Sequence, residues 1–220
     1  MAPTERTTGR RYPERVTHDR EAAYAILDEA LVAHVGFTTD DGPVVIPTLH
    51  ARDGDRLLLH GSAHGRAMAS MGSGIEVCVT VTLLDGLILG RASSHHSGSY
   101  RCVMLYGRAT VIEDVRERTE LLNRIVEGIV PGRLTGPNAA RPAGPDEAVH
   151  TAVLSLPIEE FSVKVRAGFA RDEPKDDGVE AWAGHVPFRL VAGSPVPDAI
   201  TGTRFPGPDL ATLRGVHPGA

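Results

Sequence analysis

Short runs of Val, Ile, Leu and Thr, each closed by a turn signal, constrain the fold of this chain most strongly. The runs AHVGFTT, PVVIPTLHA and RLLLHG occupy residues 33–39, 43–51 and 56–61, and the turn sequences DDGP and RDGD separate them. Connections this short between strand-like runs predict antiparallel hairpins. A longer β-branched run follows at residues 75–93, and its Asp85-Gly86 pair is predicted to form another hairpin turn.

Helical periodicity appears in only three segments. Residues 19–33 carry apolar side chains at helical spacing behind the N-cap Asp19, residues 63–74 predict a short helix closed by glycines, and residues 115–130 have an apolar helical face. Residues 151–168 are interpreted as a last strand, bent at Pro157. Together these elements predict a mainly β (α+β) fold, a small antiparallel β-barrel with peripheral helices.

Composition divides the chain into three parts. Residues 1–18 are polar and rich in arginine and predict a flexible N-terminal arm, while residues 19–168 hold the strands and helices of one barrel domain. Residues 169–220 are acidic and rich in proline and glycine. We expect them to form an extended tail that packs on the domain or on a partner chain.

Charge and composition argue against several classes of function. The net charge of −5 offers no general attraction for nucleic acid, so DNA or RNA is not an expected partner. No apolar run approaches the about 20 residues of a membrane-spanning helix, and residues 1–15 lack the apolar stretch of a signal peptide. The only two cysteines, Cys78 and Cys102, are spaced unlike a zinc site. These features predict a reduced, cytoplasmic protein.

Two strand segments carry residues that suit ligand binding. In LHGSAHGRAM (residues 59–68), small residues precede a helix start and Arg66, an arrangement that can hold a phosphate. An ordinary strand-to-helix turn with a surface arginine explains that stretch equally well. Pro47 lies inside a strand, where it removes a ladder donor, and Thr48 beside it offers a hydroxyl. The alternative at Pro47 is an edge strand or a bulge.

The segment HHSGSYRC (residues 95–102) holds two adjacent histidines and a Tyr-Arg-Cys run between two strand-like segments. Neighbouring residues of an extended chain point to opposite sides, so one of His95 and His96 can face a pocket while the other faces solvent. No Asp or Glu lies at a useful spacing, and we expect no metal site here. The alternative is a plain polar hairpin loop. The sequence has no nucleophile elbow, P-loop or dinucleotide fingerprint.

Six phrases in this order resemble the pyridoxamine 5'-phosphate oxidase-like family, in its flavin-nucleotide-binding branch related to the nitroimidazole-resistance reductases. They are AILDEALVAHVGF, GPVVIPT, DGDRLLLHGS, VCVTVTLLDGL, HHSGSYRCVMLYGRA and LPIEEFSVKVRAG…WAGHVPF, and they span residues 19–184. The resemblance implies an FMN-binding split β-barrel, a homodimer with its two flavin sites at the subunit interface.

The resemblance also implies roles for individual residues. The isoalloxazine would lie near Pro47, Thr48 and Leu49, and near Cys102 with its neighbours Tyr100 and Arg101. The ribityl chain and phosphate would lie near His60, Gly61, Ser62 and Arg66. Further phosphate or interface residues would be Lys164 and Arg166. His95 and His96 are the candidate catalytic residues, because a neutral imidazole can move a proton beside a flavin. The substrate-phosphate residues of true pyridoxamine phosphate oxidases are not recognisable, so vitamin B6 synthesis is not expected.

Three functional hypotheses follow. The first is an FMN-dependent oxidoreductase acting on a small organic molecule, with a nicotinamide or deazaflavin as electron source. The second keeps the fold but places haem in it, with an axial ligand among His60, His64, His95 and His96. The third is a flavin-binding protein without catalytic activity.

Overall fold

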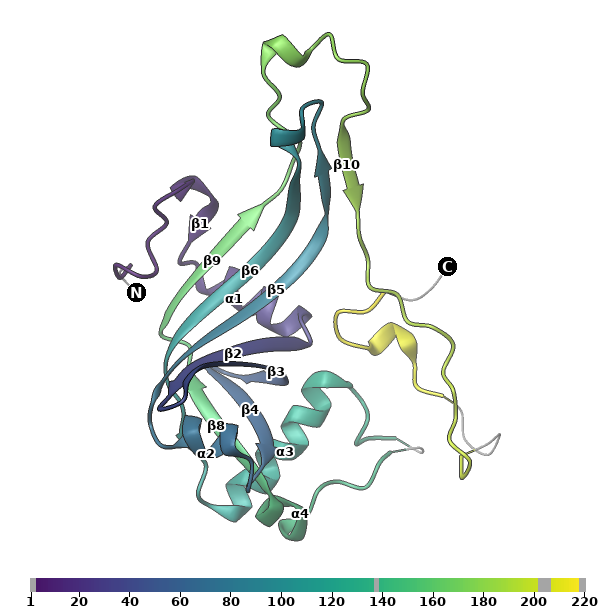
Figure 1. Cartoon of the computed structure of the whole chain (residues 1–220). Coiled ribbons are helices and arrows are strands. Elements are labelled where there is room, and N and C mark those ends of the chain that lie inside the picture. The colour runs from purple at the N-terminus through teal and green to yellow at the C-terminus, as the bar shows by residue number, and fades with distance from the viewer. Residues whose placement is uncertain (1–2, 137–138, 202–206, 218–220) are drawn as a thin grey trace.

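The computed structural model describes residues 3–136, 139–201 and 207–217. Its centre is an antiparallel sheet of ten strands in the order β1-β9-β6-β5-β2-β3-β4-β8-β7, with β10 paired to β5 (Figure 1). The strands are β1 (Val16–Thr17), β2 (Val32–Thr39), β3 (Gly42–Asp53), β4 (Arg56–Ser62), β5 (Glu76–Leu89), β6 (Ser97–Arg108), β7 (Thr110–Val111), β8 (Thr151–Pro157), β9 (Glu160–Arg166) and β10 (Gly184–Pro187). The predicted mainly β, antiparallel architecture is confirmed.

Within the described residues, four α-helices accompany this sheet. They are α1 (Arg20–Glu29), α2 (Arg66–Gly72), α3 (Val115–Ile129) and α4 (Pro145–His150), and short 3-10 turns include η1 (Pro13–Arg15), η2 (Ser93–His95), η3 (Pro174–Asp176) and η4 (Leu210–Thr212). The Asp19 side chain accepts a hydrogen bond from the Glu21 amide, which confirms it as the N-cap of α1. Asp114 caps α3 in the same way.

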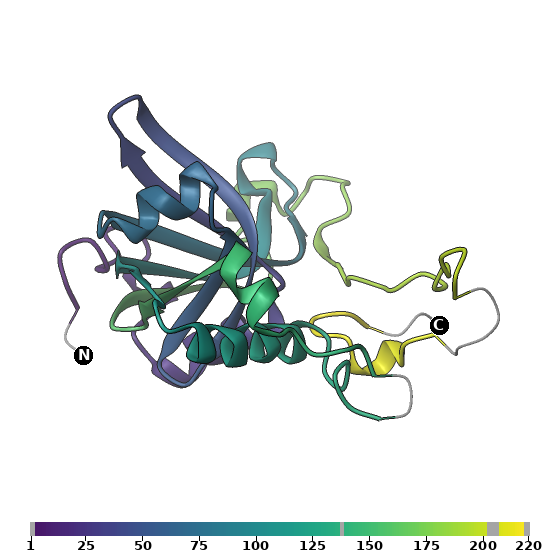
Figure 2. The ribbon, with the colours of Figure 1, turned by 90° about the horizontal axis from the view of Figure 1, so that it is seen from below.

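The sheet bends through β3, so that two halves enclose one apolar core. Residues 42–49 of β3 pair with β2, and residues 50–53 pair with β4. The barrel core contains Val35, Phe37, Leu57, Leu105 and Phe161, and α1 adds Ile26 and Leu27. A second core lies between α3 and the outside of β4 and β8. In Figure 2, α3 lies along one side of the barrel.

Two expectations about the strands are wrong. Asp85-Gly86 is not a hairpin turn, because β5 continues to Leu89 with only a bulge between Leu84 and Gly86. Strand β10 lies so close there that a Cβ on Gly86 would come within 2.3 Å of the Val186 carbonyl oxygen. The chain reverses instead at residues 90–96. Residues 151–168 form two strands, not one bent strand, because β8 pairs with β4 and β9 with β6.

Both ends of the chain pack on the barrel. Strand β1 pairs with β9, and the Arg6 guanidinium forms ion pairs with Glu160 and Glu76. At the other end β10 pairs with β5, and residues 188–201 and 207–217 run beside the barrel on the side away from the N-terminus (Figures 1 and 2). Arg214 is buried and donates to the carbonyl oxygens of Leu27, Ala30 and His50. The proposed boundaries of arm, domain and tail remain a prediction. Among the described helices, none is long and apolar enough to cross a membrane.

Candidate functional site

The site is built on the outer face, which we define as the side of β3, β2, β5, β6 and β9 that points away from the barrel core. Alternate residues of each strand point to this face, and cross-strand pairs place them in rows. One row joins Pro47 to His34, His34 to Thr80 and Thr80 to Met104. Pro47 and His34 are exposed, while Thr80 and Met104 are half-buried. This row is a largely apolar surface with one imidazole on it.

A second row gathers several of the residues predicted for flavin contact. Leu49 pairs with Val32, and both side chains are 42% exposed. Cys102 pairs with Thr82 on one side and with Lys164 on the other. Burial raises the pKa of the Cys102 thiol, so this sulfur is kept protonated on the face.

Tyr100 continues the outer face, whereas Arg101 leaves it. Tyr100 pairs with Leu84 and with Arg166. Arg101 points to the opposite side, where its guanidinium lies 2.5 and 2.8 Å from the carboxylate of Glu29 and 2.8 and 2.9 Å from that of Asp85. These carboxylates hold the pKa of Arg101 above its usual value. In this structure Arg101 therefore fixes the end of α1 against β5.

The predicted phosphate region lies at the end of β4 and the start of α2. Strand β4 pairs with β8 from Arg56 to Ser62, and Arg66 is the first residue of α2. Gly61 faces Met68 so closely that a Cβ would lie 3.0 Å from the sulfur. Arg66 is exposed, and it forms no hydrogen bond or ion pair with the described residues. Its guanidinium is therefore available to a ligand at no cost to an existing contact.

His60 is the half-buried imidazole of this region. Its Nδ1 atom is buried without a hydrogen-bond partner in the described part of the chain, and burial lowers its pKa. A buried polar atom without a partner costs folding free energy, and metal or ligand binding is one reason such an atom persists. Ser62 and His64 lie beyond it in an exposed turn.

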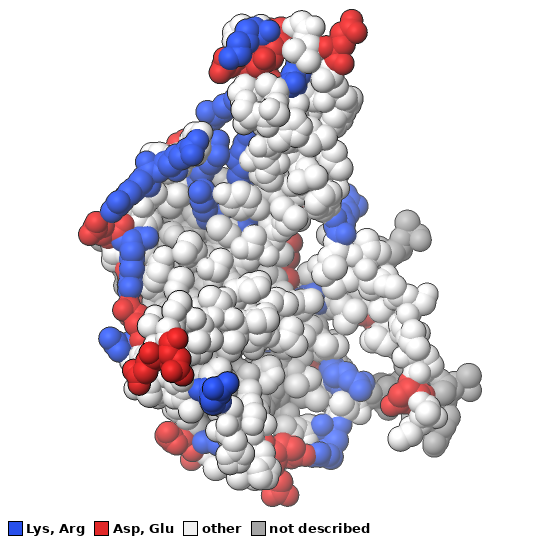
Figure 3. Space-filling view, in the orientation of Figure 1, with Lys and Arg blue, Asp and Glu red and all other residues white. Residues whose placement is uncertain are grey.

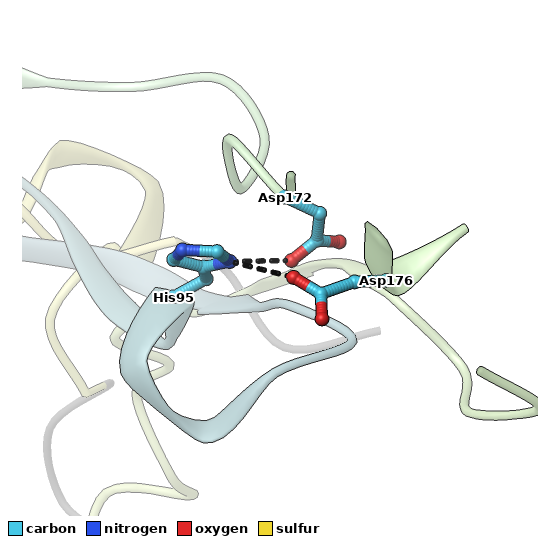
Figure 4. A group of neighbouring side chains, drawn as sticks. All are labelled: His95, Asp172 and Asp176. Carbon is cyan, nitrogen blue, oxygen red and sulfur yellow. Dashed lines mark hydrogen bonds and ion pairs between the residues drawn. The ribbon is translucent and has the colours of Figure 1, made fainter. Parts of the chain in front are cut away.

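The two candidate catalytic histidines point to different surroundings. His95, in η2, turns toward the segment after β9, where its Nδ1 lies 3.1 Å from Asp172 and 3.8 Å from Asp176 (Figure 4). Asp172 also accepts hydrogen bonds from the backbone amide and side chain of Arg91. His95 thus ties the hairpin tip to residues 172–176. His96 is exposed, and its Nδ1 contacts the Ala92 carbonyl oxygen.

In the sequence, no Asp or Glu was found at a spacing that would suit a metal site with His95, and these two aspartates were not considered. Asp172 lies 77 residues later in the chain, so no local spacing could reveal the contact. The three donor atoms lie within 4.8 Å of one another, close enough in principle for a shared cation. Arg91 already neutralises Asp172, and we read the group as an ion-paired clamp between hairpin and tail.

The structure also adds His34, which the sequence analysis passed over. Its exposed ring lies directly opposite Pro47 on the outer face. The alternation in VAHVGFTT carried the signal, because Val35 and Phe37 are core residues and His34 must then point outward. The outer face thus combines apolar side chains with the His34 imidazole, the thiols of Cys78 and Cys102 and the Lys164 amine. Such a surface can support a flat aromatic ring and exchange protons with it.

The chain was compared with known proteins. The family model described as pyridoxamine 5'-phosphate oxidase matches residues 19–165. The flavocytochrome Anf3 of Azotobacter vinelandii is 38% identical, with a TM-score of 0.86 over 94% of this chain and 95% of that one. The FAD and haem binding protein of Mycobacterium smegmatis is 29% identical, with a TM-score of 0.83 over 91% and 98% of the two chains.

A third structure extends the likeness at the level of fold. The putative 5-nitroimidazole antibiotic resistance protein of Bacteroides thetaiotaomicron is 23% identical, with a TM-score of 0.57 over 68% of this chain and 86% of that one. No curated protein matches the chain. The family model covers well over half of the sequence, and the fold is the split barrel of that family. The chain belongs to the pyridoxamine 5'-phosphate oxidase family.

Proposed function

We propose that this protein is an oxidoreductase that holds both a flavin and a haem and passes electrons between them. The observation that carries the proposal is the 38% identity to a flavocytochrome over 94% of the chain. The family model ends at residue 165, so a match of this extent includes most of the C-terminal region as well. On the sequence alone, flavin and haem were alternative cofactors. The names of the two relatives favour the hypothesis that one protein holds both.

The outer face fits a flavin. An isoalloxazine is a large flat ring, and the exposed side chains of Pro47, Leu49 and Val32 offer it an apolar support. Arg66 is free to form a charge-assisted hydrogen bond with a flavin phosphate. When bound, the flavin would supply hydride and single-electron chemistry. Residues of the face would hold it, and Cys102 with its protonated thiol would lie beside it.

The histidines fit a haem in a more limited way. His60 has a buried Nδ1 without a partner, and burial keeps its ring neutral, as an iron ligand must be. His34 is exposed on the apolar face and is a second candidate. His95 is committed to two aspartates, which makes it the weakest of the histidines first considered. We assign His60 as the axial ligand to be tested first.

A homodimer is part of the proposal. The outer face and the far end of the β5–β6 hairpin expose Val45 at 66%, Leu84 at 55% and Leu87 at 41%, an unusual amount of apolar surface for strand residues. A second copy of the chain would cover this surface and would enclose a flavin that one chain leaves open on one side. The two cysteines are unbridged, which agrees with a reducing, cytoplasmic setting.

The test is the visible spectrum of the purified full-length protein, with the released cofactors identified by mass spectrometry. The proposal expects two flavin bands and a Soret band, and a fall in the flavin absorbance that precedes a shift of the Soret band when a reductant is added. A flavin spectrum without a Soret band would reject the haem and return the first hypothesis, an FMN-dependent oxidoreductase of a small organic substrate. A colourless protein that takes up neither cofactor would reject both.

A further inference from the structure

A group of arginines gathers where the N-terminal arm meets the end of β9. We call it the β9 cation cluster and define it as Arg11, Arg15, Arg166 and Arg171, with Lys164 two residues before Arg166 on the same face of the strand. Figure 3 shows Lys and Arg side chains along this edge of the molecule. The chain as a whole has 28 acidic and 23 basic residues, so a local surplus of positive charge goes against its composition.

Few carboxylates balance the cluster. Arg15 has Glu14 at 3.9 Å, and that carboxylate is itself 55% exposed. Arg166 donates only to the carbonyl oxygens of Ala167 and Phe169. Neither Arg171 nor Lys164 forms an ion pair with a described residue. Burial and the neighbouring charges of Arg15 and Arg171 lower the pKa of Arg166, as expected where like charges are crowded.

Aromatic rings accompany these cations. The Arg15 guanidinium lies 4.0 Å from the centre of the Tyr12 ring, and Arg11 lies 5.1 Å from it. Tyr12 has a φ of 61°, the only positive value among the described non-glycine residues, and such a backbone is strained. Phe169 is 71% exposed, and its carbonyl oxygen accepts a hydrogen bond from Arg166. The cluster therefore combines cations with an exposed aromatic residue, Phe169, whose backbone contacts Arg166.

From this arrangement we propose that the β9 cation cluster binds the adenosine diphosphate portion of a dinucleotide. The two phosphates would lie between Arg15, Arg166 and Arg171, and the adenine would stack on Phe169. Two adjacent phosphates carry more negative charge than one cation can balance, which explains three guanidiniums with a single carboxylate among them, Glu14 at 3.9 Å from Arg15. Exposed aromatic rings stack on any base face. A monophosphate would need neither the third arginine nor the ring.

Two dinucleotides share this chemistry, and both rest on the proposed function, since each presupposes a bound flavin. One is the flavin itself, which would then be FAD, with its adenylate half reaching the β9 edge. The other is a nicotinamide dinucleotide that delivers electrons to the flavin. The two sources differ in one respect: FAD would already fill the surface of the purified protein, whereas a nicotinamide dinucleotide would leave it open.

The experiment titrates ADP into the purified full-length protein with its own cofactors, and identifies and quantifies the flavin that remains after repeated dilution. It uses Arg171→Glu and Phe169→Ala, both exposed positions whose replacement leaves the core intact. Arg116→Glu on α3, an 89% exposed side chain, makes the same charge change away from the cluster, and Phe188→Ala removes another exposed ring.

Either source gives a distinct result. If the ligand is a nicotinamide dinucleotide, ADP binds the wild type and competes with NADH or NADPH. Arg171→Glu then lowers the affinity for ADP roughly ten- to hundredfold. If the ligand is FAD, ADP does not bind, the released flavin is FAD, and Arg171→Glu and Phe169→Ala lose it at least about tenfold more readily than their controls.

The proposal is overturned if neither result is found. In the first such outcome, ADP binds Arg171→Glu and the control Arg116→Glu with the same affinity. In the second, ADP does not bind the wild type, and Arg171→Glu and Phe169→Ala retain flavin as well as their controls do. Either outcome would leave the flavin and Soret bands of the wild type untouched. Failure of this inference is therefore separate from failure of the proposed function.

Discussion

Arg214 and His50 are in direct contact although 164 residues separate them, with the guanidinium Nη2 2.9 Å from the imidazole Nε2. Both side chains are buried. Arg214 also donates to carbonyl oxygens at the C-terminal ends of α1 and α3, those of Leu27, Ala30 and Gly128. A cation in this position suits the negative end of a helix dipole. One tail residue thus caps two helices and fixes one histidine.

Replacing Arg214 by Ala should destabilise the protein by ~2–4 kcal/mol, because several buried carbonyl oxygens would lose their donor. The free energy of unfolding from urea titrations measures this. Arg214→Lys should recover part of the loss, since an ammonium offers three donors without the planar fork. Arg116→Ala, at an exposed position of α3, is the control. Equal stability of Arg214→Ala and that control would contradict the capping role.

His50 should make stability fall in mild acid. Burial, and then the nearby charge of Arg214, lower the pKa of His50 from 6.5 to about 4. The folded protein therefore holds this imidazole neutral, while the unfolded chain protonates it below pH 6.5. Stability from His50 is complete above about pH 6.5 and is lost as the pH falls toward 4, by up to ~3 kcal/mol.

The measurement is the free energy of unfolding at several pH values between 4 and 7 for the wild type and for His50→Gln. The variant should show the shallower pH dependence, because glutamine does not titrate. Taking the difference between the two proteins removes the contribution of His60, whose lowered pKa acts in the same direction. Identical slopes would show that His50 does not titrate in this range.

Arg66→Ala should weaken flavin binding roughly ten- to hundredfold, the range expected for the loss of one charge-assisted contact. Stability without flavin should be unchanged, since Arg66 has no partner among the described residues. Fluorescence titration with FMN and with FAD measures the two affinities, again with Arg116→Ala beside it. If flavin binds equally well to both variants, the phosphate lies elsewhere.

His60→Ala should abolish the Soret band while the flavin bands remain. His34→Ala tests the outer face in the same way, and His150→Ala, at an exposed position of α4, is the matched control. Loss of the Soret band in His34→Ala alone would assign the iron ligand to His34 and the haem site to the outer face. An intact band in every single variant would exclude each of these residues as a required iron ligand.

His95→Asn should loosen the segment after β9, because it removes the contact to Asp172 and Asp176. Limited proteolysis should then cut residues 167–177 faster, whereas His96→Asn should leave the rate unchanged. With a substrate in hand, His96→Asn should be the variant that slows turnover, since its ring is the exposed one. Equal proteolysis of His95→Asn and the wild type would deny the clamp.

Local sequence patterns correctly predicted helix caps, helices and tight hairpins, because each of these depends on residues that are close in the sequence. Asp19 as a cap, the helix at 115–129 and the hairpins near residues 40 and 54 follow from neighbours in the sequence. The turn predicted at Gly86 was wrong because the conformation there depends on β10, about 100 residues further on. The same limit applies to Arg101 and His95: each looked free in the sequence, and each has a partner more than 70 residues away. The order of the strands depends on pairings between distant segments, which local patterns do not specify.

Strand β5 has a mechanical consequence. It pairs with β2 near its start, with β6 along its length and with β10 near its end, and 14 residues at ~3.3 Å make it about 46 Å long. A strand bonded to β6 throughout resists bending, so a small rotation at the barrel produces a large displacement at the hairpin tip. The bulge at Leu84–Gly86 interrupts this stiffness at one place. At this place the Phe188 amide donates a hydrogen bond to the Asp85 carbonyl oxygen and Pro187 pairs with Gly86, so residues 187 and 188 brace the junction between the barrel and the β5–β6 hairpin.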